Sequence, residues 1–183
     1  MKLFIISLLL ISVTFFPSQS YAQSDTQAEA EVVTETAEKV DVYALFWPVV
    51  PGKTVADSMF WAKQLKENLG GVFSFGDINK SKYQIELSEK RLVEANKLFE
   101  DKDYTNAAKS LDLNKANRDE ALKLMKKARE EKRKVDELTG RLVTSLENQE
   151  TVLKYLVTQL PDDQKSKIEE ILKDLTLQIS EAR

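Results

Sequence analysis

The C-terminal 107 residues, from Asp77 to Arg183, contain only two residues that commonly end helices, Gly140 and Pro161. A stretch of this length without turn clusters favours long helices. Large apolar residues recur every seven positions in its first part, as on one face of an amphipathic helix. These residues are Ile78, Ile85, Leu92 and Phe99. The whole chain has only 5 Gly and 4 Pro in 183 residues, which disfavours a turn-rich β fold. The sequence therefore predicts an all-α fold, an antiparallel helical bundle with long helices.

Three boundaries are predicted within this helical region. Residues 101–103 form a polar break after the first helix. A second apolar pattern runs over residues 105–160, and a straight helix of that length would measure about 84 Å at 1.5 Å per residue. Because such a helix is too long for a domain of this size, we expect it to bend or break near Gly140. Pro161 begins the last helix, since proline is favoured in a first turn.

An apolar segment with two prolines, residues 42–52, precedes the bundle. Proline disfavours a helix and favours an extended path, so we predict an extended aromatic and proline-rich N-terminal arm. A short helix is expected to follow, beginning near Thr54 or Asp57 and ending before the glycine pair at 70–71. Residues 72–76 are predicted to form an apolar linker.

Five aromatic residues gather between positions 47 and 75. They are Trp47, Phe60, Trp61, Phe73 and Phe75. We predict that they pack together where the arm and the linker cross the bundle, because exposing so much apolar surface to water is unfavourable. Trp47 is expected to be buried near Trp61, with Phe46 beside it. A pocket for a cofactor or a peptide is the alternative, so Trp47, Pro48 and Trp61 are candidate binding or packing residues.

Four charged residues of the helix that begins near Asp77 are further candidates. Arg91 lies beside Leu92, and its guanidinium is expected to bridge two helices through a Glu or Asp, with ligand binding as the alternative. Glu86, Glu89 and Glu94 are expected on the surface rather than paired for acid–base chemistry, because surface carboxylates are the common case.

The densest charged run, residues 123–134, has seven basic and two acidic residues. We interpret it as a solvated helix face on which Glu130 and Lys134 form an ion pair. Docking on anionic lipid, a wall polymer or nucleic acid is the alternative. No aromatic residue lies within the run, and residues 42–183 carry 25 basic and 24 acidic residues, so no nucleic-acid partner is predicted.

The chain contains no Cys and no His. This excludes a thiolate nucleophile, a zinc–thiolate site, an imidazole metal ligand and a Ser/His/Asp triad. The acidic residues near Asp101 lack the ligand spacing and the Gly of a calcium-binding loop. We therefore predict no enzyme activity and no catalytic, cofactor-binding or metal-binding residues.

The N-terminal residues have the three parts of a secretory signal peptide. Lys2 is basic, residues 3–16 are an uncharged apolar run, and Ser20 and Ala22 are small. Residues 1–22 are therefore predicted to be a signal peptide that is cleaved after Ala22, with an uncleaved membrane anchor as the alternative.

Two segments are predicted after the signal peptide. Residues 23–41 carry six acidic residues against one Lys, which indicates an acidic disordered tether. Residues 42–183 are predicted to form a single helical domain, and no segment of the mature chain has the apolar length of a transmembrane helix.

Three sequence blocks occur in an order that resembles a known family. They are WPVVPGKTVADSMFWAKQLKE at 47–67, SEKRLVEA at 88–95 and FEDKDYTNAAKSL at 99–111. Together they resemble the bacterial extracytoplasmic family called domain of unknown function 5667. The resemblance covers a core of about residues 45–130, with further C-terminal helices at 131–183. It implies an exported helical domain, and it implies no reaction because none is assigned to the family.

These features together predict an exported, non-enzymatic helical binding or scaffold module of the bacterial cell envelope. The expected location is extracytoplasmic, whether periplasmic, secreted or at the cell surface. The expected partner is an unidentified envelope protein or polymer, and no motif sets an oligomeric state. A periplasmic holdase-type chaperone is the alternative, and it would need an exposed concave apolar face. A carboxylate-only hydrolase of wall glycans would need two buried acids and is the least favoured class.

Overall fold

The structure is a computed structural model, and it describes residues 40–183. Every regular element in this part of the chain is a helix. In chain order, the helices are α1 (Val42–Leu45), α2 (Phe60–Phe73), α3 (Asp77–Glu100), α4 (Tyr104–Glu130), α5 (Asp136–Gln159) and α6 (Asp162–Ala182). The predicted all-α fold is confirmed. The predicted signal peptide, residues 1–22, and residues 23–39 of the predicted tether lie outside the described residues.

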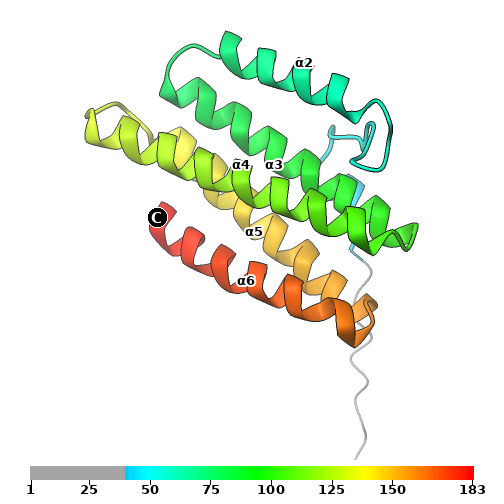
Figure 1. The fold of residues 1–183 in the computed structure, drawn as a ribbon. Coiled ribbons are helices and arrows are strands. Elements are labelled where there is room, and N and C mark those ends of the chain that lie inside the picture. Colours follow the sequence, from blue (N-terminus) through cyan, green and yellow to red (C-terminus); the bar gives the residue numbers. More distant parts are fainter. Residues whose placement is uncertain (1–39) are drawn as a thin grey trace, which may run out of the picture. The chain divides into compact units, whose positions relative to one another are not determined.

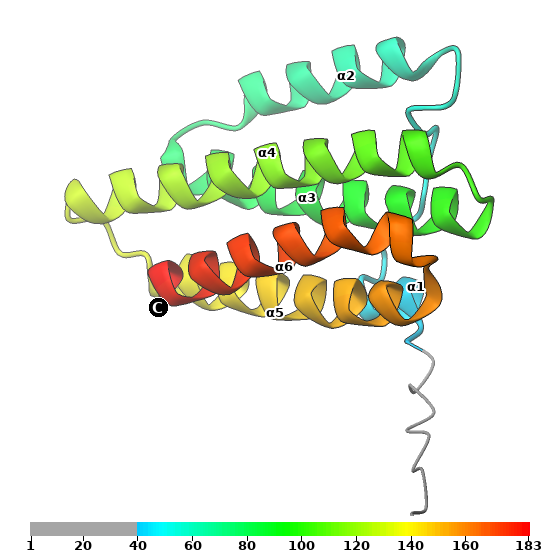
Figure 2. The same cartoon turned by 60° about the horizontal axis from the view of Figure 1, so that its bottom comes forward.

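The four longest helices form two antiparallel hairpins. α3 packs along α4 and α5 packs along α6, and the two hairpins are stacked on one another (Figure 1). α2 contacts α3 and lies on the side of the α3–α4 hairpin away from α5 and α6 (Figure 2). This arrangement is the predicted antiparallel bundle, with α2 as an additional outer helix.

Apolar side chains from all four long helices fill the space between the hairpins. Fully buried members of this core include Ile85, Leu92, Leu111, Met125, Leu142, Leu153 and Leu175. The apolar residues whose spacing predicted amphipathic helices therefore also form the core. Among residues 40–183, no helix combines the length and the apolar character needed to cross a membrane.

A short polar turn at residues 101–103 joins α3 to α4, as predicted. The backbone of Lys102 is left-handed, with φ of 59°, and the N–H of Asp103 donates to the carbonyl of Leu98 at 2.8 Å. The Asp103 side chain caps α4 by accepting from the N–H of Asn106 at 3.2 Å. The side-chain amide and the backbone N–H of Asn106 stabilise the carboxylate, and they lower the pKa of Asp103.

The stretch 105–160 does break, as predicted, but before Gly140: α4 ends at Glu130 and α5 begins at Asp136. Gly140 is an exposed residue within α5, and apart from the adjacent backbone of the helix itself no atom lies within 4 Å of the position where a Cβ would be. A glycine in a helix costs only about 1 kcal/mol relative to alanine, so the helix continues through it.

The turn between α4 and α5 instead lies at residues 131–135, within and just after the run of six charged residues from 129 to 134. Ala128 and Val135, on either side of this run, are buried in the core, so turning here moves no apolar side chain into water. Lys132 is left-handed with φ of 58°. The predicted ion pair between Glu130 and Lys134 required a continuous helix and is absent from this turn.

The N-terminal arm begins with one helical turn rather than with the predicted extended segment. Asp41 caps α1 by accepting a hydrogen bond from the N–H of Ala44 at 3.0 Å. Val42 and Phe46 lie one turn apart, and both are buried in the core. The two prolines lie beyond α1, so their preference for extended backbone takes effect only after it.

α2 also differs from its predicted boundaries. It begins at Phe60, because Thr54 and Asp57 form a separate turn in which the N–H of Thr54 donates to the Asp57 carboxylate at 2.5 Å. It then continues through the glycine pair at 70–71 to Phe73, so the predicted linker is shorter than expected.

Candidate binding surface

The structure places the four candidate residues in three environments. Trp47 and Pro48 are exposed on the arm, Trp61 is exposed on α2, and Arg91 of α3 is buried. Trp47 is 78% exposed and Trp61 is 65% exposed. The prediction that the two tryptophans are buried together is therefore wrong. On the arm, Phe46 is buried in the core instead of Trp47. A turn follows Phe46, in which the N–H of Val49 donates to the Phe46 carbonyl.

The predicted aromatic cluster is absent because α2 turns its apolar side towards solvent. Large apolar residues at every fourth position of α2 are between 51% and 70% exposed, and they form one ridge along the helix. These ridge residues are Trp61, Leu65, Leu69 and Phe73. Met59, Val72 and Phe75 beside the ridge are also more than half exposed. We call this set of seven residues the outer face of α2.

The opposite side of α2 faces α3 and is polar. Lys63 and Glu67 lie one turn apart on this side, and Gly70 and Ser74 continue it at spacings of three and four residues. Glu67 is buried and Lys63 is half-buried, although neither is an apolar residue. α2 is therefore inverted relative to a usual surface helix, whose apolar stripe packs on the core.

Arg91 lies at the centre of the contact between α2 and α3. Its guanidinium forms ion pairs with Glu67 of α2 and with Glu94 of α3, the second at 2.8 Å. The structure thus contains the predicted bridge between two helices. Lys63 of α2 pairs with Glu94 from the other side, and Lys90 pairs with Glu67 at 2.9 Å. We call these five residues the α2–α3 ion-pair network.

Because the α2–α3 ion-pair network is buried, its charged side chains depend on one another rather than on water for stabilisation. The Glu94 side chain is 0% exposed and the Arg91 side chain is 4% exposed. Burial lowers the pKa of Lys63, while Glu94 acts against this change. The Phe60 ring covers both cations, with its centroid 5.0 Å from the Arg91 guanidinium carbon and 5.6 Å from the Lys63 Nζ. Removing Arg91 would leave each buried carboxylate with a single lysine as its partner, which is destabilising because little water can replace the lost charge.

One of the two adjacent glycines of α2 allows the helix to lie close to α3. The Tyr83 hydroxyl of α3 donates to the Glu67 carbonyl at 2.9 Å, and a Cβ on Gly70 would lie 2.5 Å from that hydroxyl oxygen. A Cβ on Gly71 would lie 3.6 Å from the Tyr83 ring, which is ordinary contact. Only Gly70 is therefore required by packing.

We expect Gly71→Ala to raise the free energy of unfolding by about 0.5–1 kcal/mol, because alanine is the better helix former. Gly70→Ala brings the same helix propensity but must displace the Tyr83 hydroxyl, so it should be clearly less stable than Gly71→Ala. Chemical denaturation of the two variants provides the comparison. Equal effects at the two positions would show that α2 does not lie against Tyr83 as described.

Trp47 and Pro48 border a second feature, a groove of about 690 Å3 between the arm, α3 and α5. Glu89 of α3 and Arg141 of α5 line the same groove. Burial raises the pKa of Glu89, while a hydrogen bond from Ser145 and the charge of Arg141 act in the opposite direction. Glu89 is half-buried, so the prediction that it lies on the surface is only partly right.

The raised pKa of Glu89 has a consequence for stability. A carboxyl whose pKa is higher in the folded state stabilises the fold below its unfolded pKa of about 4.3, and that contribution is lost as the pH rises through the folded pKa. We expect Glu89→Gln, which stays neutral, to unfold at higher denaturant concentration than the wild type at pH 7 but not at pH 4. The exposed neighbour Glu86, substituted by Gln, should show no such gain. A gain for Glu89→Gln that is equal at both pH values would contradict this expectation.

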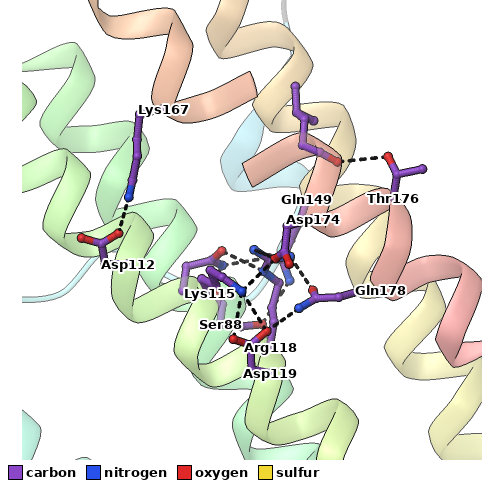
Figure 3. Close-up of polar contacts among 12 residues, drawn as sticks. Ser88, Asp112, Lys115, Arg118, Asp119, Gln149, Lys167, Asp174, Thr176 and Gln178 are labelled. Atoms are coloured by element: carbon purple, nitrogen blue, oxygen red, sulfur yellow. Dashed lines mark hydrogen bonds and ion pairs between the residues drawn. The ribbon is translucent and has the colours of Figure 1, made fainter. Parts of the chain in front are cut away.

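A second buried polar cluster joins the two hairpins at their centre (Figure 3). The Asn114 amide of α4 donates to the Ser88 carbonyl at 2.7 Å and to Gln149 of α5 at 2.8 Å. Arg118 of α4 donates to Asn114 at 3.1 Å and also to Gln178 of α6. Burial lowers the pKa of Arg118 to about 10, which leaves the side chain charged at neutral pH. Because the cluster connects all four long helices, we assign it to holding their register.

Sequence reasoning missed the network residues Lys63, Glu67 and Glu94. Glu94 was expected on the surface and is fully buried, because α3 is covered on all sides from Arg91 to Asn96. A signal was present in α2, where Lys63, Glu67 and the glycines share one side and the four ridge residues share the other. That pattern defines two sides of a helix but does not state which one faces the bundle.

Comparison with known proteins adds one finding. A family model described as Domain of unknown function (DUF5667) matches residues 53–183. The match includes α2 to α6, so it begins later and ends later than the core of about 45–130 inferred from the sequence blocks. No match was found among curated proteins or among solved structures.

Proposed function

We propose that this chain, which belongs to the DUF5667 family, is an exported, non-enzymatic helical binding or scaffold module of the cell envelope. Its contact surface is the outer face of α2. The observation that carries this proposal is the inverted packing of α2, which exposes four ridge residues while charged side chains occupy the buried side.

The size of the outer face supports a binding role. Monomeric proteins rarely expose a contiguous apolar patch of more than a few hundred square ångströms unless it serves an interaction. Nine of the ten large apolar residues that are strongly exposed in the described part lie between Trp47 and Phe75, and seven belong to the outer face of α2. Exposed apolar surface is therefore concentrated on this helix and its flanks rather than scattered.

The ion-pair network supports the same role. It fixes α2 against α3, so the ridge is already arranged before a partner arrives. A surface that is ordered in advance loses less conformational entropy on binding. The absence of Cys and His from the sequence supports the non-enzymatic part of the proposal, because the usual nucleophile and base pairs cannot be built.

The second candidate, a holdase-type chaperone, is favoured by the exposed apolar ridge. It is disfavoured by shape, because the ridge stands out from a helix and does not line a concave face. A holdase should suppress the aggregation of several unrelated denatured clients, and Leu65→Ser with Leu69→Ser should abolish this effect. A binding module should protect none of them.

The contact surface can be tested with a photo-crosslinking amino acid placed at Leu65 in cells that export the protein. Leu177 of α6, which is 64% exposed, provides the matched control position. We expect a discrete crosslinked product from position 65, either with another envelope molecule or with a second copy, and none from position 177. No discrete product from position 65, or equal products from both positions, would refute the proposed surface.

The export part of the proposal has its own test. Residues 1–22 have the signal-peptide pattern, so we expect mass spectrometry of the envelope fraction to find a new N-terminus at Gln23. Recovery of the intact Met1 form in the membrane would show that the segment is kept as an anchor.

A further inference from the structure

The geometry of the outer face points to a specific partner. We infer that it binds the same face of a second copy of this chain, so that the protein acts as a two-fold symmetric pair. The inference rests on the proposed function, because it names the partner of the same surface. Three properties of α2 lead to it: the area of the face, the spacing of its ridge and the scarcity of charge on it.

The area of the outer face matches one side of a stable dimer. Its three aromatic residues, Trp61, Phe73 and Phe75, are 65–79% exposed and together offer on the order of 300–500 Å2. The four aliphatic residues of the face are each at least half exposed and contribute a similar area. The total is close to the roughly 800 Å2 per partner that a standard specific interface buries.

The spacing of the ridge suits a second helix. Trp61, Leu65, Leu69 and Phe73 follow the i±4 row of α2, which is the row used in the commonest type of helix packing. Two such rows interlock when the helices cross at about −50°. In a two-fold symmetric pair the same surface of each copy forms the interface. The row on one α2 would therefore pack into the groove beside the identical row on the other α2.

The charge on α2 favours a second copy over a lipid surface. Lys66 is the only charged residue among the fully exposed positions of the helix. Helices that lie on membranes usually carry several Lys or Arg residues beside their apolar side, and these attract anionic lipid. On α2 the other charged residues, Lys63 and Glu67, point into the ion-pair network instead. An apolar face with a single cation can pair with itself without strong repulsion.

The first test is the mass of the native processed protein in sedimentation equilibrium. We expect a dimer with a dissociation constant in the micromolar range or tighter. Leu65→Glu places two carboxylates in the interface and should weaken association by roughly 100-fold or more. Leu177→Glu introduces the same charge at a similarly exposed leucine of α6 and should leave the dimer intact. Circular dichroism should show that both variants keep the helical fold.

The second test uses the absence of cysteine from the chain. Single variants Leu65→Cys and Leu69→Cys each place one thiol on the ridge, and Leu177→Cys is the matched control. Mild oxidation should link at least one ridge variant into a disulfide dimer at concentrations at which the control stays monomeric. This measurement does not depend on the stability of a charged variant.

Three results would overturn the inference: a monomer at concentrations up to roughly 100 μM, a dimer that Leu65→Glu leaves unchanged, or no selective ridge disulfide. Binding of the wild type, but not of Leu65→Glu, to vesicles of phosphatidylcholine and phosphatidylglycerol without dimer formation would assign the face to lipid and would also overturn it. In each case a crosslink from position 65 to another envelope molecule would leave the proposed function standing. Loss of both kinds of product would refute the function as well.

Discussion

Replacing Arg91 with alanine is expected to lower the free energy of unfolding by about 3–5 kcal/mol, which is the usual cost of breaking a buried ion pair. The substitution would leave the buried carboxylates of Glu67 and Glu94 with only the two lysines as partners. Chemical denaturation measures the loss. Hydrogen exchange should increase first in α2, because its contact with α3 depends on this guanidinium.

Two further variants test whether the loss comes from breaking a buried ion pair. Lys90→Ala removes a more exposed partner of Glu67, with 32% of its side chain accessible, and should cost about 1 kcal/mol or less. Arg91→Met combined with Glu94→Leu removes one charge of each sign and should recover part of the loss, since apolar residues often replace buried ion pairs without penalty. An Arg91→Ala variant within 1 kcal/mol of the wild type would mean that the network does not hold α2.

The second large effect is expected on the arm. Phe46→Ala should lower the free energy of unfolding by about 3–5 kcal/mol, because its ring is only 4% exposed and lies in the main core. Trp47→Ala removes a larger ring from the next position, yet it should change stability by less than about 0.5 kcal/mol because that ring is exposed.

The two adjacent substitutions should be compared by thermal and chemical unfolding under the same conditions. Sequence reasoning places both rings in the packed arm and therefore predicts a large loss for Trp47→Ala as well. A large loss for Trp47→Ala would restore that interpretation, which the structure overturns.

The long helices could be predicted from sequence because the residue pattern that defines each helix lies within the helix itself. The seven-residue spacing from Ile78 to Phe99 defines α3, and the polar residues 101–103 mark its end in both the sequence and the structure. The break between α4 and α5 could not be placed in this way. A glycine is the usual sequence signal for a break, but the chain turns at residues 131–135, where the charged run 129–134 lies between the buried residues Ala128 and Val135.

The candidate site was predictable only in part, because its main feature depends on tertiary contacts. The bridging role of Arg91 follows from its position beside a buried leucine. The orientation of α2 does not follow from its own sequence, since a sequence pattern assigns the apolar side to the core by default. Only the partners on α3, namely Arg91, Glu94 and Tyr83, show that the polar side faces inwards.

The apolar side of α2 faces away from α3, and Trp61, which lies on that side, reports directly on this orientation. Trp47→Phe leaves Trp61 as the only tryptophan in the chain. In dilute, folded protein its fluorescence should have the long-wavelength maximum of a hydrated indole and should be quenched readily by acrylamide. The maximum should move to shorter wavelength as the protein concentration rises and the faces pair. A short-wavelength maximum with weak quenching in dilute, monomeric protein would place the ridge against the bundle and would contradict the account.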